Sequence, residues 1–131
     1  MFSVYYTIKQ VSSRTSLPEY TLRYYEKEGL LPSVGRSEGG IRRFSEEDID
    51  WIGLICCLKS TGMPIRQIRE FVDLSRQGDE TLKQRCEMLA EHKKNVEKRL
   101  ETMQAQLRKV TKKIECFTSQ YVDYCNSNRT V

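Results

Sequence analysis

Three side chains on one short stretch carry groups that hydrogen-bond to phosphate. Tyr20, Arg23 and Tyr24 follow one another at helical spacing and offer phenol hydroxyls and a guanidinium. Such groups on an exposed helix face donate to the phosphate oxygens of DNA and fix the register of a protein on the duplex. Adjacent helical residues point about 100° apart, so one of Tyr24 and Tyr25 should belong to the core. The alternative interpretation is an ordinary solvated helix surface.

Two further arginines flank a glycine turn. Arg36 and Arg42 lie on either side of residues 37–40, with the sequence Ser-Glu-Gly-Gly, inside a glycine-rich segment, 32–44, that cannot form a helix. This pattern predicts a β-hairpin with an arginine on each arm. A hairpin of this kind can lie along the DNA backbone or in the minor groove, with an affinity that falls steeply with salt. Solubilising surface charge is the alternative interpretation.

Two short helices should precede the hairpin. The first covers residues 7–14 with Thr7 as its cap, and the second begins at a capping-box pair, Ser16 and Glu19, and ends at Gly29. Two short helices joined by a tight turn, the second with basic and aromatic side chains, are typical of a helix-turn-helix.

Two more helices should follow the hairpin. Ser45 has capping-box spacing to Asp48, Gly62 ends the first of these helices, and Pro64 suits the first turn of the second. Both show apolar residues at helical spacing: Ile49, Ile52, Ile55 and Leu58, then Ile65, Ile68, Phe71 and Val72. We therefore expect residues 1–76 to form one small winged helix-turn-helix domain.

A heptad pattern runs from about residue 79 to 121 with no proline or glycine. Only Lys93 interrupts its apolar positions, which are Leu82, Cys86, Leu89, Val96, Leu100, Met103, Leu107, Val110, Ile114, Phe117 and Tyr121. A single helix would leave this stripe in water, so a second copy of the chain is the economical partner. We expect a homodimer through a coiled-coil helix, 77–122, and a flexible C-terminal tail, 123–131. The heptads leave parallel and antiparallel pairing open.

Composition excludes several function classes. The net charge is a modest +4, and no apolar run is long enough for a transmembrane helix. The first residues lack the pattern of a signal peptide, so we expect a cytoplasmic protein without membrane contact. Catalytic pairs, phosphate loops and nucleophile constellations are also lacking, and the single histidine, His92, falls on the long helix. We therefore expect neither an enzyme nor a cofactor.

Five cysteines supply thiols at spacings that match no zinc module: Cys56, Cys57, Cys86, Cys116 and Cys125. In a reducing cytosol most of them should be free thiols.

Three segments, 6–11, 21–32 and 40–49, closely resemble the MerR family of bacterial regulators. The Leu-Arg-Tyr-Tyr run at 22–25 is the most specific part, and the similarity extends from residue 6 to about 76. The resemblance implies a mainly α fold: a winged helix-turn-helix with a small β-hairpin wing, a helix pair acting as a second wing, and a long antiparallel coiled-coil dimerisation helix. It implies sequence-specific regulation at a double-stranded promoter whose overlong spacer the protein bends and untwists, so that RNA polymerase engages both promoter elements.

The family pattern also implies the DNA-contacting residues. They are Tyr20, Thr21, Arg23 and Tyr24 on the recognition helix, Arg36 and Arg42 on the wing, and Lys59 near the second wing. Ile41 departs from the pattern, because the family usually has tyrosine there. A hydroxyl contact to phosphate is therefore missing.

The segment 51–63 resembles the branch of the family that responds to aldehydes and thiol stress, and Cys57 matches the cysteine of that branch. Lys59 and DNA-contacting arginines nearby would favour the reactive thiolate. The opposing interpretation is a cysteine on an apolar helix face, acting as an inert hydrophobe.

Other interpretations of the signal stay open. The long helix takes up the remaining chain, so we expect no appended ligand-binding domain. A soft-metal sensor would use Cys86, Cys116 and Cys125 from two subunits, but a mercury-sensor-like stretch at 89–92 places Lys83, and not Cys86, at the first ligand position. We therefore expect no metal site. A DNA-binding architectural protein without a sensor is the third possibility.

Overall fold

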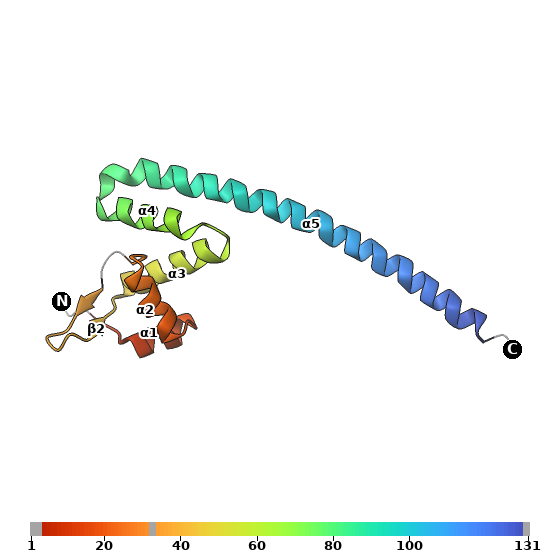
Figure 1. Ribbon diagram of the computed structural model, residues 1–131, viewed down its shortest axis with the longest axis horizontal. Coiled ribbons are helices and arrows are strands. Elements are labelled where there is room, and N and C mark those ends of the chain that lie inside the picture. The colour runs from red at the N-terminus through yellow and green to blue at the C-terminus, as the bar shows by residue number, and fades with distance from the viewer. Residues whose placement is uncertain (1–3, 32–33, 130–131) are drawn as a thin grey trace. The chain divides into compact units, whose positions relative to one another are not determined.

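Most of the residues are helical in the computed structural model, which describes residues 4–31 and 34–129 (Figure 1). Its elements are α1 (Ile8–Thr15), α2 (Glu19–Lys27), β1 (Gly35–Arg36), β2 (Arg42–Arg43), α3 (Glu46–Ser60), α4 (Ile65–Arg76), the 3-10 helix η1 (Asp79–Thr81) and α5 (Leu82–Ser127). Two compact units result, residues 1–92 and 93–131. The first turns of α5 therefore belong with the N-terminal unit, whereas the boundary expected from the sequence lay after residue 76.

The start of α1 is capped as expected, and the start of α2 is not. The Gln10 amide donates to Thr7 Oγ1 over 3.2 Å, and the Thr7 amide donates to Gln10 Oε1 over 2.8 Å. The predicted Ser16 cap of α2 is wrong: Ser16 ends α1 in a left-handed conformation, with φ of 60°, and Pro18 precedes α2. The fixed φ of proline suits a helix start, so no serine cap is needed.

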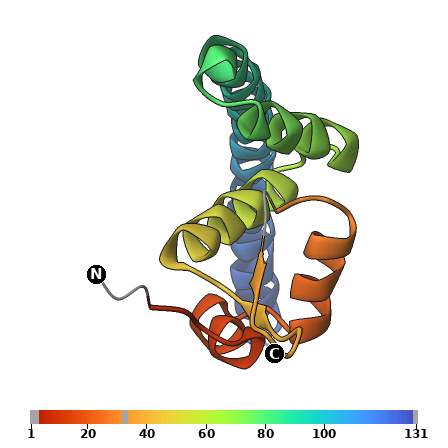
Figure 2. The same cartoon turned by 90° about the vertical axis from the view of Figure 1, so that its left-hand side faces the viewer.

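The predicted hairpin is present, and in Figure 2 it lies beside α2. Gly35 pairs with Arg43 and Arg36 with Arg42 in antiparallel register. The Gly40 amide donates to the Ser37 carbonyl over 2.9 Å, and φ of +77° at Gly40 favours a residue without a side chain. The start of the predicted wing, Pro32 and Ser33, lies outside the described residues.

The core of the N-terminal unit lies between α1, α2, α3 and α4. Ser45 and Asp48 form the predicted capping box at the start of α3, whose apolar face is then buried. Tyr25 is buried and Tyr24 is not, which answers the question that the sequence left open. The largest fully buried side chains are Phe44, Leu22, Leu30, Ile52, Ile55, Ile68, Val11 and Val72.

A surface network joins the N-terminal segment to α1 and α3. Arg14 and the Tyr6 hydroxyl both donate to the Glu46 carboxylate, over 2.7 and 2.6 Å to Oε1, and the Arg14 guanidinium lies 5.0 Å from the centre of the Tyr6 ring. Donation from Arg14, and then from Tyr6, lowers the pKa of Glu46. The same hydrogen bond to Glu46 raises the pKa of Tyr6. Glu46 therefore stays ionised and holds the three segments together.

The first turns of α5 pack on the N-terminal unit. Leu89 contacts the buried core, although the heptad pattern placed it in the dimer stripe. One turn later, His92 Nε2 lies 2.7 Å from Thr61 Oγ1, just after the end of α3. Leu89, which we expected in the dimer stripe, therefore makes a contact within its own chain.

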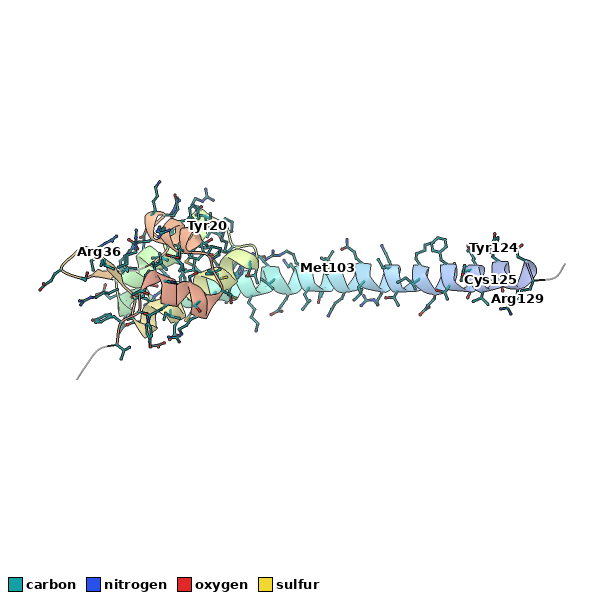
Figure 3. All side chains as sticks on the ribbon, turned by 90° about the horizontal axis from the view of Figure 1, so that it is seen from below. Tyr20, Arg36, Met103, Tyr124, Cys125 and Arg129 are labelled. Carbon is teal, nitrogen blue, oxygen red and sulfur yellow. The ribbon has the colours of Figure 1, made fainter. Side chains whose placement is uncertain are left out.

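Beyond His92, α5 exposes its apolar stripe. The side chains from Leu100 to Tyr121 in the stripe are more than half exposed, and Figure 3 labels one of them, Met103, along this part of the helix. The helix continues to Ser127, so residues 123–127 are helical and not the irregular tail that we expected. No glycine or proline interrupts this stretch, which explains why the helix continues. Residues 130–131 of that tail lie outside the described part of the chain.

In the described part of the chain, none of the helices has the length and apolar character needed to cross a membrane.

Candidate nucleic-acid interface

Helix α2 separates a buried face from a face of hydrogen-bond donors. Leu22 and Tyr25 are buried, whereas Tyr20 is 73% exposed and Arg23 and Tyr24 are also exposed. Figure 3 shows Tyr20 projecting from the N-terminal unit. Thr21 is only half-buried, so its hydroxyl lies at the border of this face. The face can present hydroxyl and guanidinium groups to a phosphate backbone.

Arg23 is only weakly engaged within the chain. Its Nη2 lies 3.4 Å from Oε1 of Glu19, one turn earlier, and both side chains are well exposed. Exposed ion pairs of this type contribute about 0–1 kcal/mol. Arg23 can therefore exchange Glu19 for a phosphate at little cost.

Both wing arginines meet one carboxylate on α2. Arg36 Nη2 donates to Oε1 of Glu26 over 2.7 Å, and Arg42 Nε donates to Oε2 over 2.7 Å. Arg36 also donates to the Gly40 carbonyl across the turn, over 3.1 Å. The two arginines were predicted from the sequence, and Glu26 was missed. The available signal for Glu26 was the pair of like charges expected on the two arms of the hairpin, because an acidic neighbour relieves their repulsion.

Lys59 joins the end of α3 to α2. Its ammonium lies 5.0 Å from the centre of the Tyr24 ring and 5.4 Å from that of Tyr25. A cation over aromatic faces is attracted by about 0.5–1 kcal/mol at exposed sites. The structure thus brings α2, the hairpin and the end of α3 together, and each contributes a basic side chain that was predicted to contact DNA.

Ile41 is the exposed apolar residue of the wing. It is 65% exposed and follows directly after the turn, where the family resemblance led us to expect a tyrosine. Its side chain carries no donor, so Ile41 itself can contribute only apolar side-chain contacts to a partner.

The two adjacent cysteines of α3 differ in exposure. Cys57 is exposed and Cys56 is half-buried, while Ile55 and Leu58 on either side of the pair are buried. Within a single chain, Cys57 is therefore not a buried hydrophobic residue. The Cys57 carbonyl accepts from the Thr61 hydroxyl over 2.7 Å. The same Thr61 hydroxyl also contacts His92 on α5, so a single residue links the Cys57 backbone to α5.

The other three cysteines lie apart along α5. Cys86 and Cys116 are exposed, and Cys125 is half-buried. Over residues 4–31 and 34–129, no three cysteine, histidine, aspartate or glutamate side chains converge in a way that could hold a metal ion.

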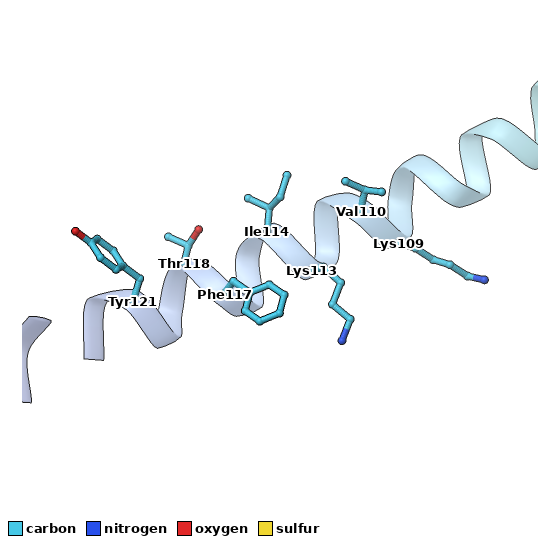
Figure 4. A pocket seen from close by; sticks show the side chains of 7 residues that line it. All are labelled: Lys109, Val110, Lys113, Ile114, Phe117, Thr118 and Tyr121. Carbon is cyan, nitrogen blue, oxygen red and sulfur yellow. The ribbon is translucent and has the colours of Figure 1, made fainter. Parts of the chain in front are cut away.

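An apolar groove follows the C-terminal half of α5 (Figure 4). Val110, Ile114, Phe117 and Tyr121 line it, with Lys109 and Lys113 at its margin. These are heptad positions of the predicted coiled coil with their flanking lysines. The groove is open, which suits a second helix better than a small ligand.

Two family models match the chain. The model of the MerR HTH family regulatory protein matches residues 6–74, and the model described as MerR, DNA binding, matches residues 49–112. Together they cover the recognition helix, the hairpin, α3, α4 and the first part of α5.

Related bacterial sequences agree with this assignment. An uncharacterised HTH-type transcriptional regulator of Haemophilus influenzae is 43% identical over 70% of this chain and 67% of its own length. The HTH-type transcriptional regulator AdhR of Bacillus subtilis is 40% identical over 68% of this chain, although the match spans only 64% of AdhR.

The fold matches a DNA-bound regulator. The structure of HiNmlR, a MerR family regulator lacking the sensor domain, bound to promoter DNA, has a TM-score of 0.83 and 35% identity over 88% of this chain and 92% of that one. A MerR family regulator from Bacillus thuringiensis has a TM-score of 0.78 and 40% identity over 85% of this chain and 97% of that one. The chain therefore belongs to the MerR family and is a DNA-binding transcriptional regulator, not an enzyme.

Proposed function

We propose that the chain binds promoter DNA as a homodimer, with Tyr20, Thr21, Arg23 and Tyr24 on α2, Arg36 and Arg42 on the wing, and Lys59 at the end of α3 as its DNA contacts. The observation that carries this proposal is that two basic elements, the hairpin and the end of α3, meet α2, the hairpin through Glu26 and the end of α3 through the Tyr24 and Tyr25 rings. The similarity to HiNmlR, a structure bound to promoter DNA, supports it.

The exposed stripe of α5 supports dimerisation. Between Leu100 and Tyr121 the stripe finds no cover within the described part of its own chain, and a second α5 is the partner that would bury it. The family resemblance favours antiparallel pairing. Two DNA-binding units held at a fixed separation would bind a pseudo-palindromic site.

The regulatory step would be a deformation of the promoter. A dimer that bends and untwists an overlong spacer lets RNA polymerase reach both promoter elements, and the energy of that deformation depends on the sequence of the spacer.

Cys57 is the proposed sensor of aldehyde, electrophile or oxidative thiol stress. Its exposure makes the thiol accessible, and the similarity to AdhR fits the stress-responsive branch. With an aldehyde, the Cys57 thiolate would add to the carbonyl carbon, and the carbonyl oxygen would take up a proton to give a hemithioacetal. The hydrogen bond from Thr61 to the Cys57 carbonyl, and the Thr61 contact with His92, offer a route from this thiol to α5.

The experiment is in vitro transcription from the neighbouring promoter, with formaldehyde, the thiol oxidant diamide and a soft metal ion tested separately. Cys57→Ser should keep DNA binding and lose the response to formaldehyde and diamide. Cys56→Ser, one residue away in the same helix, is the matched control and should keep the response.

The outcomes separate the candidate functions. A Cys57→Ser protein that still responds to aldehyde or oxidant refutes the sensor assignment. A response to metal alone, abolished in variants of Cys86, Cys116 or Cys125, would support a soft-metal sensor shared between subunits. A wild-type protein that binds the promoter and ignores all three agents would be a regulator without a sensor, comparable in this respect to HiNmlR, which lacks the sensor domain.

A further inference from the structure

We propose that Glu26 is a positioning residue for DNA binding, which holds the wing at a fixed angle to the recognition helix and orients Arg42 toward the phosphate backbone. This inference rests on the proposed role of the wing in DNA binding. Its basis is the pair of 2.7 Å contacts that bring Arg36 and Arg42 onto one carboxylate.

The hairpin needs such a partner because it is small. Its strands have two residues each, and short isolated hairpins are at best marginally stable. Arg36 and Arg42 are directly opposite each other in the register, where two like charges repel. A carboxylate that accepts from both guanidiniums converts this repulsion into two charge-assisted hydrogen bonds. The partner comes from α2, so the same contacts fix the hairpin relative to the recognition helix.

The contacts leave donors of Arg42 available. Arg42 uses Nε for Glu26, and among the described residues its Nη1 and Nη2 have no hydrogen-bond partner. Arg36, in contrast, divides its terminal nitrogens between Glu26 and the Gly40 carbonyl. Arg42 can therefore bind a phosphate while it remains attached to Glu26, whereas Arg36 mainly fastens the turn. The three side chains together keep a net charge of +1, from two guanidiniums and one carboxylate.

The test compares two glutamate-to-glutamine variants that change the net charge equally. Glu26→Gln removes the shared carboxylate, and Glu38→Gln removes an exposed carboxylate from the wing turn that has no ion pair among the described residues. Pure electrostatics predicts tighter DNA binding for both variants, because each removes a negative charge from the wing region. The positioning role predicts the opposite sign for Glu26→Gln, with affinity about tenfold weaker.

The measurement uses full-length protein and a DNA duplex that the wild type selects from a random-sequence pool, titrated over a range of salt concentrations. Circular dichroism and thermal melts establish that each variant is folded at the temperature of the titration. A double-mutant cycle with Arg42→Gln supplies a readout that a general loss of stability would not move. In the Arg42→Gln background, Glu26→Gln should have little further effect on affinity.

The results distinguish this inference from the proposed function. If Arg42→Gln alone leaves both the affinity and its salt dependence unchanged, the wing does not bind DNA and the proposed function is at fault. If Arg42→Gln weakens binding but Glu26→Gln tightens it as Glu38→Gln does, Glu26 competes with phosphate and the positioning role is wrong. Equal weakening by Glu26→Gln with and without Arg42 would also overturn it.

Discussion

At the scale of single residues, the basic side chains of the N-terminal unit differ in how strongly they are bound within the chain. Arg36 and Arg42 share a carboxylate over short distances, whereas Arg23 meets Glu19 at 3.4 Å on an exposed surface. Lys59 rests on two tyrosine rings. Of these four basic side chains, Arg23 can therefore change partner at the lowest cost when DNA arrives.

Replacement of Arg23 by alanine should weaken DNA binding across different sequences. Fewer counterions are released when one phosphate is no longer neutralised, so the slope of log affinity against log salt should fall by about one for each such phosphate. Fluorescence anisotropy on the selected duplex at several salt concentrations measures both quantities. Lys98→Ala removes the same charge from α5 and should leave the slope near that of the wild type. An unchanged slope in Arg23→Ala would show that α2 does not face the backbone as proposed.

At the scale of elements, α5 serves two purposes along its length. Leu89 packs against the core of the N-terminal unit and His92 contacts Thr61, whereas the stripe from Leu100 onward is exposed. The early positions of the heptad pattern therefore make contacts within the chain, and the later positions form an exposed surface. The helix itself is also continuous, so only the neighbouring elements distinguish the two parts.

Two leucine truncations on α5 should have different effects. Leu89→Ala removes a partly buried side chain from the core and should destabilise the N-terminal unit by about 1–2 kcal/mol at every protein concentration. Leu107→Ala removes the same atoms from the exposed stripe. It should lower stability only at protein concentrations low enough for the subunits of the proposed dimer to separate. Urea unfolding followed by the fluorescence of Trp51, the single tryptophan, reports on the N-terminal unit. Identical concentration dependence for the two variants would contradict this division of α5.

At the scale of the whole molecule, the proposed function depends on a second copy of the chain. A single recognition helix reads one half-site, and two linked units gain affinity because the second binding event is intramolecular. The apolar groove of Val110, Ile114, Phe117 and Tyr121 is the surface that would link the two units in the proposed dimer.

A charge placed in this groove should separate the subunits. Ile114→Asp buries a carboxylate in the proposed interface and should yield a monomer by analytical ultracentrifugation. Its affinity for the selected duplex should fall about a hundredfold or more. Ser119→Asp introduces the same carboxylate away from the stripe and should remain a dimer with normal affinity. A dimeric Ile114→Asp protein, or a monomer that binds DNA as tightly as the wild type, would refute the proposed dimer interface.

The sequence by itself determined the elements whose signals are local. The Thr7 cap, the Ser45 and Asp48 capping pair, the glycine turn of the hairpin, and the helical periodicity of α3, α4 and α5 all act within a few residues, so they can be read without the fold. The family resemblance reached further, to the recognition helix and the wing. The misassigned Ser16 cap shows the limit, because the choice between ending α1 and starting α2 depends on the geometry of the turn between them.

Only the tertiary structure decided which of these residues meet. Glu26 lies ten residues from Arg36 and sixteen from Arg42, and Thr61 lies thirty-one from His92, so no periodicity connects them. Leu89 has the same heptad signal as Leu107, yet it is partly covered by its own chain because it packs against the core of the N-terminal unit. These contacts depend on how distant segments pack together. The pattern along the chain indicates only which side chains are able to make such contacts.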